Sequence, residues 1–135
     1  MGLLVICRHG ESEWNLLGKW TGWTDVGLTE KGRADSVIMG SLIKNIRFDE
    51  AYTSALKRTR QTLDALLEGC GIGSLPTTQA VELNERDYGD LTGKNKWQVK
   101  DEIGEEAFNG IRRGWDYPAS DVYKRQNYRW ARIFY

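Results

Sequence analysis

Three short segments of the chain are predicted to be strands, and the first of them is a continuous apolar run. They cover residues 3–7, 48–53 and 77–83. The first run, Leu-Leu-Val-Ile-Cys, is continuously apolar and is followed directly by a charged residue, which is typical of a strand buried on both faces. We therefore expect three strands, with the first covered from both sides.

Apolar residues at helical spacing follow the first two runs. Thr29 stands in an N-cap position ahead of Glu30, and the stripe after it consists of Ala34, Val37, Ile38, Leu42 and Ile43. A second helical period starts at Leu56 and must stop at Gly69, Gly71 and Gly73. A third helical stretch covers residues 97–108 and is broken near Gly104. The pattern thus predicts helices between the strands and after them.

The alternation of strand and helix predicts an α/β fold with a mostly parallel sheet flanked by helices. Parallel neighbours need crossover connections, and helices are the usual crossover. Neither an internal repeat nor a low-complexity linker interrupts residues 1–118, and 135 residues suit one domain. We expect residues 1–118 to belong to a single domain.

The charge balance and the apolar content of the chain argue against several classes of binding partner and location. Nineteen basic residues balance nineteen acidic ones, which argues against nucleic acid and against an anionic membrane surface as partners. The longest apolar run is far too short to span a membrane, and no basic segment precedes it as in a signal peptide. Cys7 and Cys70 lack metal-ligand spacing, so we expect reduced thiols, no metal and a cytoplasmic location.

The segment Arg8-His9-Gly10-Glu11-Ser12-Glu13-Trp14-Asn15 directly follows the first predicted strand. Ligands of open α/β sheets bind at the carboxyl ends of strands. His9 is the chain's single histidine, beside a permanent cation and a glycine that allows close approach of a ligand. This pattern favours an imidazole that attacks phosphorus while Arg8 neutralises phosphoryl oxygens. A purely structural histidine at a strand end remains the alternative on these residues alone.

The same segment resembles the RHGxS signature of the histidine phosphatase superfamily. The stretch from Thr21 to Gly32, TGWTDVGLTEKG, resembles the more specific TGWxDxxLTxxG segment of cofactor-dependent phosphoglycerate mutases. The resemblance continues in order through residues 52–58, 83–89 and 93–96 and ends at Arg112-Arg113. It thus covers essentially all of residues 2–118.

The resemblance implies a role for each matching position. His9 matches the phosphorylated nucleophile, Arg8 and Arg58 match the arginines that hold the transferring phosphoryl group, and Glu85 matches the proton donor and acceptor. The residues that would contact substrate are Arg8, His9, Gly10, Glu11, Ser12, Glu13, Trp14, Asn15, Thr21, Gly22, Arg58, Glu85, Arg86, Asp87, Tyr88, Lys96, Arg112 and Arg113. Taken alone, Arg58, Glu85 and the Arg112-Arg113 pair also fit solvated surface charges.

The function that the resemblance implies is interconversion of 2- and 3-phosphoglycerate through a phosphohistidine. The partner is then a small phosphorylated carboxylic acid, and 2,3-bisphosphoglycerate is the priming phosphoryl donor, without a metal. Two alternatives stay open: a histidine phosphatase that hydrolyses small phosphate esters, and a phosphate-ester-binding fragment without turnover. Whether the parent enzyme is a homo-oligomer is open as well.

Two features set this chain apart from the family pattern. The family uses a second histidine late in the chain, whereas the 135 residues contain only His9. Residues 119–126 can be encoded by a nucleotide sequence that resembles a transposase adapter used in library preparation, so residues 119–135 are interpreted as a non-native tail. We therefore expect an incomplete, C-terminally truncated catalytic domain at 1–118, inactive and poorly folded as it stands.

Overall fold

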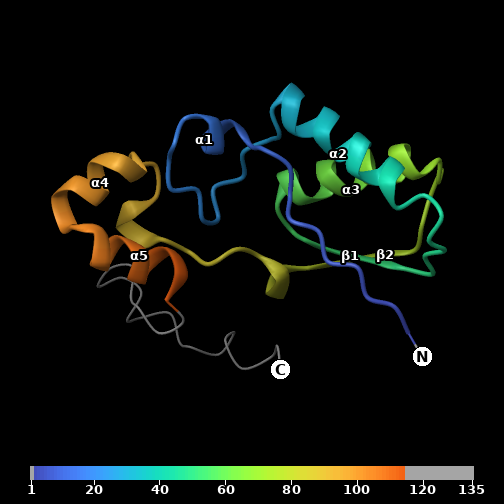
Figure 1. The fold of residues 1–135 in the computed structure, drawn as a ribbon. Coiled ribbons are helices and arrows are strands. Elements are labelled where there is room, and N and C mark those ends of the chain that lie inside the picture. Colours follow the sequence, from blue (N-terminus) through green and yellow to red (C-terminus); the bar gives the residue numbers. More distant parts are fainter. Residues whose placement is uncertain (1, 115–135) are drawn as a thin grey trace. The chain divides into compact units, whose positions relative to one another are not determined.

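The computed structural model describes residues 2–114 (Figure 1). Its elements are, in order, α1 (Glu13–Leu16), α2 (Glu30–Leu42), β1 (Ala51–Ser54), α3 (Lys57–Cys70), β2 (Thr77–Ala80), the 3-10 helices η1 (Val81–Leu83) and η2 (Gly89–Leu91), α4 (Lys96–Ile103) and α5 (Glu105–Arg113). The described residues form two compact units. The first comprises residues 2–13 and 25–81, and the second comprises residues 14–24 and 82–114.

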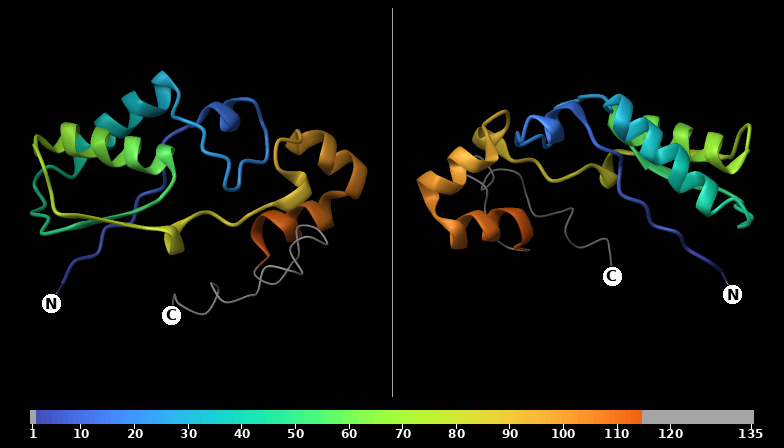
Figure 2. Two further views of the ribbon diagram at one scale, coloured as in Figure 1. Left: turned by 180° about the vertical axis from the view of Figure 1, so that it is seen from behind. Right: turned by 45° about the horizontal axis from the view of Figure 1, so that its top comes forward.

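The first unit is a small parallel sheet with two helices on one side. Strands β1 and β2 pair in parallel, from Ala51 opposite Thr77 to Ser54 opposite Ala80. Helices α2 and α3 run side by side, and α3 lies between α2 and the sheet (Figures 1 and 2). The α/β class and the parallel pairing predicted from the sequence are confirmed.

Helix α2 begins where the sequence predicts but packs on a different face. The Thr29 hydroxyl accepts a hydrogen bond from the Gly32 N–H, as an N-cap should. The buried residues of α2 are Gly32, Ser36 and Gly40, whereas Ala34, Ile38 and Leu42 of the predicted apolar stripe are exposed. A Cβ on Gly40 would lie 2.2 Å from the Leu66 carbonyl oxygen. The helix backbones approach too closely for large side chains to occupy the interface.

Helix α3 ends among the glycines, as the sequence predicts. Gly71 is its C-cap, with φ of 73°, and its N–H bonds the Glu68 carbonyl. Only glycine adopts this left-handed conformation without strain. The third predicted helical stretch is likewise broken at Gly104, with φ of 83°, which separates α4 from α5.

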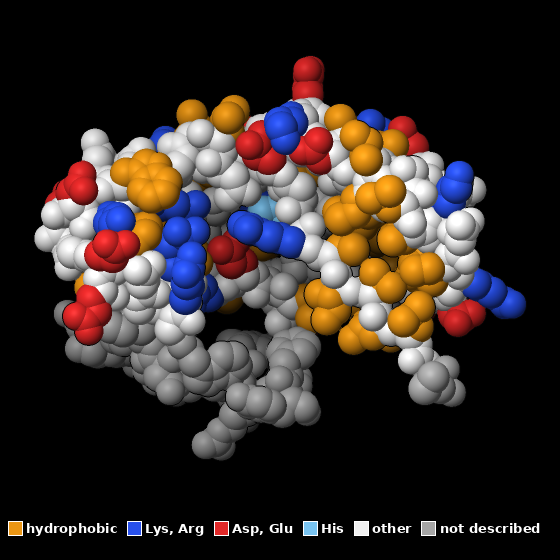
Figure 3. Space-filling model, in the orientation of Figure 1, with side chains coloured by type: hydrophobic (Ala, Val, Ile, Leu, Met, Phe, Trp, Pro, Cys, Tyr) orange, Lys and Arg blue, Asp and Glu red, His pale blue; other side chains and the backbone are white. Residues whose placement is uncertain are grey.

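The predicted strands are shorter than expected, and the first is absent. Residues 3–7 are not in a strand, and the side chains of Leu3 and Ile6 are 75% and 84% exposed rather than buried. A strand requires a hydrogen-bonded neighbour, and the sheet in the described residues consists of β1 and β2 alone. Hydrophobic side chains consequently gather on the surface of the β1–β2 unit (Figure 3). The other two predicted strands are confirmed in shortened or shifted form, as β1 and β2.

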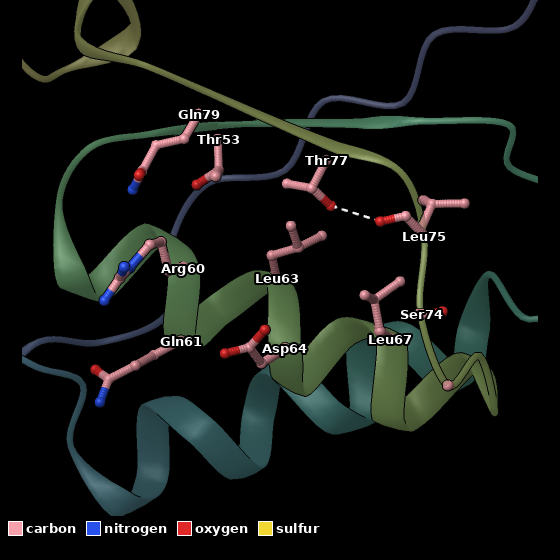
Figure 4. A pocket seen from close by; sticks show the side chains of 11 residues that line it. Thr53, Arg60, Gln61, Leu63, Asp64, Leu67, Ser74, Leu75, Thr77 and Gln79 are labelled. Atoms are coloured by element: carbon pink, nitrogen blue, oxygen red, sulfur yellow. Dashed lines mark hydrogen bonds between the residues drawn. The ribbon is translucent and has the colours of Figure 1, made fainter.

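A cavity of about 590 Å³ lies between α3 and the two strands (Figure 4). Leu63, Leu67 and Leu75 line it, together with polar side chains that include Arg60 and Asp64. Residues two apart on a helix point in nearly opposite directions. Arg60 therefore faces this cavity while Arg58, a predicted site residue, faces away from it.

The second unit is built around aromatic side chains. Trp20, Tyr88, Val99, Phe108 and Ile111 form its buried cluster. The Trp20 ring lies 4.7 Å from that of Tyr88 and 5.7 Å from that of Phe108, centroid to centroid. These are the separations of favourable tilted and edge-on ring pairs. The tryptophan thereby joins the 14–24 segment to η2 and α5.

Candidate active site

In the first unit, the backbone next to His9 fixes the imidazole. His9 is half-buried, and its Nδ1 lies 2.7 Å from the Gly10 carbonyl oxygen. A carbonyl oxygen can only accept, so Nδ1 carries the proton. In the neutral ring, Nε2 then holds the lone pair. This is the tautomer in which Nε2 can act as a nucleophile.

Gly10 is confined between two helices. A Cβ there would lie 2.4 Å from the Gly32 carbonyl oxygen and 2.7 Å from Ser36 Oγ, both in α2. On the other side, the Gly10 N–H donates to Thr62 Oγ1 of α3 at 3.0 Å. The glycine predicted for close approach of a ligand is therefore also required by close approach of α2.

Arg58 is a fully buried cation at the start of α3, with 0% exposed surface. The alternative of a solvated surface charge is therefore wrong for this residue. Asp25 lies at the same helix end, where its Oδ1 accepts from the Lys57 N–H at 2.6 Å. A carboxylate there stabilises the helix N-terminus. Burial of a guanidinium is costly unless an anion or several acceptors satisfy it, which suits a phosphate-binding role.

The remaining N-terminal residues hold the segment against α2. Ser12 is fully buried and forms an antiparallel bridge with Leu28. The Thr29 hydroxyl donates to Glu11 Oε1 at 2.9 Å, and the Glu13 N–H donates to the Gly27 carbonyl. Arg8 is exposed. Glu11, Ser12 and Glu13 thus have structural contacts in addition to their predicted contact with substrate.

In the second unit, Thr21 and Gly22 lie against the 86–88 segment. Gly22 has φ of 52°, and a Cβ on it would lie 3.2 Å from the Tyr88 nitrogen and 3.4 Å from the Arg86 carbonyl oxygen. Thr21 is buried, and its Oγ1 has no hydrogen-bond partner within the part of the chain that the structure describes. The two segments that the sequence assigned to substrate binding are therefore in direct contact.

Glu85 is held by two aromatic donors of the same unit. The Tyr88 hydroxyl donates to Glu85 Oε1 at 3.2 Å, and Trp23 Nε1 donates to the Glu85 carbonyl oxygen at 2.6 Å. Burial raises the pKa of Tyr88, and the Glu85 carboxylate acts in the same direction. Tyr88 therefore keeps its proton and remains a hydrogen-bond donor. Its bond to Oε1 orients the carboxyl group of Glu85.

The predicted basic residues lie around α5 and the start of α4. Arg86 donates to the Ile111 carbonyl oxygen at 2.5 Å, and Arg112 lies 5.4 Å above the Phe108 ring. Arg112 and Arg113 are exposed in the last turn of α5. Figure 3 shows lysine and arginine side chains gathered over this unit. A basic surface is thus present, although the last turn of a helix also favours cations.

Four further predicted residues have local structural roles. The Trp14 ring lies 5.5 Å from Lys19 Nζ, the Asn15 carbonyl accepts from the Gly18 N–H, and Asp87 Oδ1 accepts from the Gly89 N–H. Lys96 is the first residue of α4, which Asn95 caps through two backbone N–H groups.

The predicted site residues fall into the two units. Arg8, His9, Gly10, Glu11, Ser12, Glu13 and Arg58 belong to the first, and Trp14, Asn15, Thr21, Gly22, Glu85, Arg86, Asp87, Tyr88, Lys96, Arg112 and Arg113 belong to the second. Sequence reasoning missed Asp25, Thr62 and Trp23 as supporting residues. Asp25 and Trp23 lie inside the motif at residues 21–32, but the signal for Thr62 is only its position one turn after Arg58.

Within residues 2–114, no group of three or more His, Cys, Asp or Glu side chains could hold a metal ion. Among the described helices, none is both long enough and apolar enough to cross a membrane.

Known proteins resemble this chain in sequence and in fold. A 2,3-bisphosphoglycerate-dependent phosphoglycerate mutase of Rhodopseudomonas palustris is 49% identical over 118 residues, which are 86% of this chain and 57% of that protein. The crystal structure of phosphoglycerate mutase from Bacillus anthracis superposes with a TM-score of 0.68 at 26% identity, over 78% of this chain and 48% of that one.

A second kind of neighbour is a phosphatase. Phosphoserine phosphatase from Entamoeba histolytica, solved in complex with 3-phosphoglyceric acid, has a TM-score of 0.65 at 29% identity, over 84% of this chain and 54% of that one. The chain thus spans about half the length of the relatives it matches. The sequence profile of the histidine phosphatase superfamily (branch 1) matches residues 4–131. This chain belongs to the histidine phosphatase superfamily, branch 1.

Proposed function

We propose that the protein interconverts 2- and 3-phosphoglycerate by transferring a phosphoryl group through His9. The observation that carries the proposal is the imidazole of His9, whose Nδ1 is bound by the Gly10 carbonyl at 2.7 Å so that Nε2 keeps its lone pair. The buried Arg58 in the same unit suits the charge of a phosphoryl group. The 49% identity to a phosphoglycerate mutase favours this substrate over other phosphate esters.

In this mechanism His9 Nε2 attacks phosphorus and the bond from phosphorus to the ester oxygen breaks. The Glu85 carboxyl group gives its proton to the departing oxygen. In the return step, the Glu85 carboxylate removes the proton from the acceptor hydroxyl, whose oxygen attacks the phosphohistidine and releases Nε2. One carboxyl group therefore alternates between acid and base, and the Tyr88 hydroxyl at 3.2 Å orients it.

The priming donor in this proposal is 2,3-bisphosphoglycerate. When bound, it supplies the phosphoryl group that His9 takes up. The residues present fit such a ligand, because the first unit has a buried arginine and the second has a basic surface around α5. Arg8 and Arg58 would hold the phosphoryl group, and Arg86, Arg112 and Arg113 would hold the remaining anionic groups.

Three smaller parts of the proposal concern the chain as a whole. We place the enzyme in the cytoplasm, which the free thiols of Cys7 and Cys70 support. Residues 1–118 form part of the catalytic domain and residues 119–135 are a non-native tail. The tail lies outside the described residues. Full turnover by these 135 residues, which carry one histidine, is not expected.

The decisive test is phosphorylation of His9 by labelled 2,3-bisphosphoglycerate, because this half-reaction reports the first transfer step without requiring full turnover. We expect a slowly formed, acid-labile label that the His9→Asn variant lacks. Adding 3-phosphoglycerate should transfer the label to its 2-hydroxyl, giving labelled 2,3-bisphosphoglycerate and, once the 3-phosphoryl group has passed back to His9, labelled 2-phosphoglycerate, whereas a phosphatase would release labelled inorganic phosphate. Thermal stabilisation by the ligand without any label would contradict the proposal and favour a binding fragment. The absence of both label and stabilisation would contradict both readings.

A further inference from the structure

Thr62 makes two hydrogen bonds that join the His9 segment to α3. Its Oγ1 accepts from the Gly10 N–H at 3.0 Å and donates to the Arg58 carbonyl oxygen at 2.7 Å. The side chain is 4% exposed. A threonine that bonds only to the carbonyl four residues earlier is common in helices. The bond to Gly10, 52 residues away, is what distinguishes Thr62 from such a threonine.

The Gly10 residue transmits this contact to the imidazole. Its N–H is bound by Thr62 and its carbonyl oxygen by His9 Nδ1, so Thr62 is separated from the His9 ring by one residue's backbone. On the opposite side, Gly32 and Ser36 leave no room even for a methyl group on Gly10. With its N–H bound by Thr62 and the space beside its Cα closed by α2, the Gly10 backbone has little freedom to turn its carbonyl oxygen away from His9.

We infer that Thr62 is a positioning residue for phosphoryl transfer: through the Gly10 backbone, its hydroxyl keeps His9 in the tautomer that presents Nε2 as the nucleophile. It also ties that nucleophile to α3 one turn after Arg58, so that the attacking nitrogen and the phosphate-binding guanidinium share one rigid support. This inference rests on the proposed function for its chemical meaning, whereas the link from Thr62 to the His9 tautomer can be measured without turnover.

The chain offers a direct spectroscopic test, because His9 is its only histidine and the ring signals need no assignment to a residue. Thr62→Val removes the hydroxyl and keeps the shape, and Thr62→Ser keeps the hydroxyl. Thr59→Val is the matched control on the same helix. The Thr59 hydroxyl bonds the Ser54 hydroxyl at 2.8 Å and the Leu56 carbonyl at 2.7 Å, and neither contact leads to Gly10.

The first measurement is the tautomer of His9 from the ¹⁵N shifts of the ring in the 135-residue chain. We expect the wild type, Thr62→Ser and Thr59→Val to carry the proton on Nδ1, and Thr62→Val to show a mixture. The second measurement is the rate of His9 phosphorylation by labelled 2,3-bisphosphoglycerate, expected to fall about 10- to 100-fold in Thr62→Val alone, as small misplacements of a reacting group do.

Circular dichroism shows whether each variant is folded, so that loss of structure is not counted as loss of positioning. If folded Thr62→Val keeps the wild-type tautomer and rate, the inference is wrong. A mixed tautomer in Thr59→Val of the same size would overturn it too, since any α3 hydroxyl would then suffice. If the wild type is never phosphorylated, the proposed function fails, while the tautomer comparison still decides the role of Thr62.

Discussion

Helix propensity and helix packing predict opposite effects of Gly40→Ala on the stability of the protein. In an exposed helix interior, alanine is more favourable than glycine by about 1 kcal/mol, so helix propensity predicts a more stable protein. In α2, a Cβ at residue 40 would lie 2.2 Å from the carbonyl oxygen of Leu66 and 2.9 Å from its carbonyl carbon. These are backbone atoms of α3, and no change of rotamer can relieve the contact.

The helices must therefore move apart to admit the methyl group. Overpacking of this kind costs about 1–3 kcal/mol. After the gain in propensity is subtracted, Gly40→Ala should lower the free energy of unfolding by up to about 2 kcal/mol, which is a drop of several degrees in Tm. Gly69→Ala should behave in the same way, since its Cβ would lie 2.0 Å from the Val37 carbonyl oxygen.

Urea unfolding followed by far-UV circular dichroism measures the effect, and the slope of the transition shows whether the unfolded state has changed. Gly73→Ala is the control, because its Cβ would meet no atom within 4 Å and Gly73 does not have a positive φ. We expect that control to be neutral or more stable by up to about 1 kcal/mol. A Gly40→Ala protein more stable than the wild type by about 1 kcal/mol, as helix propensity alone predicts, would refute the close packing of α2 on α3.

Two further predictions concern a titrating group and a helix cap. The pKa of Tyr88 is raised above its ordinary value of 10.0, so its contribution to stability is complete below pH 10 and is lost as the pH rises beyond that value. Tyr88→Phe should therefore flatten the fall in the free energy of unfolding above pH 10, and an unchanged alkaline slope would contradict the buried hydroxyl donor to Glu85. Thr29→Ala removes the acceptor of the Gly32 N–H and the donor to Glu11, and should cost about 1 kcal/mol in urea unfolding; Thr29→Ser should restore most of it.

Local signals in the sequence predicted the helices well. Thr29 as N-cap, Gly71 as C-cap and the break at Gly104 each depend on the chemistry of one or two neighbouring residues. The packing face of α2 depends instead on how near another helix comes. Gly32 and Gly40 carry no hydrophobic signal, so the apolar stripe indicated the wrong face.

The strands were less predictable for the same reason. An apolar run shows that a segment can form a buried strand, but the strand exists only with a partner. Residues 51–54 and 77–80 pair with each other in parallel register. Residues 3–7 have the strongest apolar signal of the three and lack strand pairing in the part of the chain that the structure describes.

The candidate site shows the same division between chemistry and support. Residue type alone made His9 and Arg58 candidates, since few side chains can attack phosphorus or hold a phosphate with two parallel hydrogen bonds. The features that support their chemistry are harder to read from the sequence. The Gly10 carbonyl selects the tautomer of His9, and Thr62 binds the Gly10 N–H. Burial removes Arg58 from water. Because these supports act through the backbone and through small residues, a substitution that alters neither charge nor side-chain shape, such as valine for Thr62, should still disturb the chemistry.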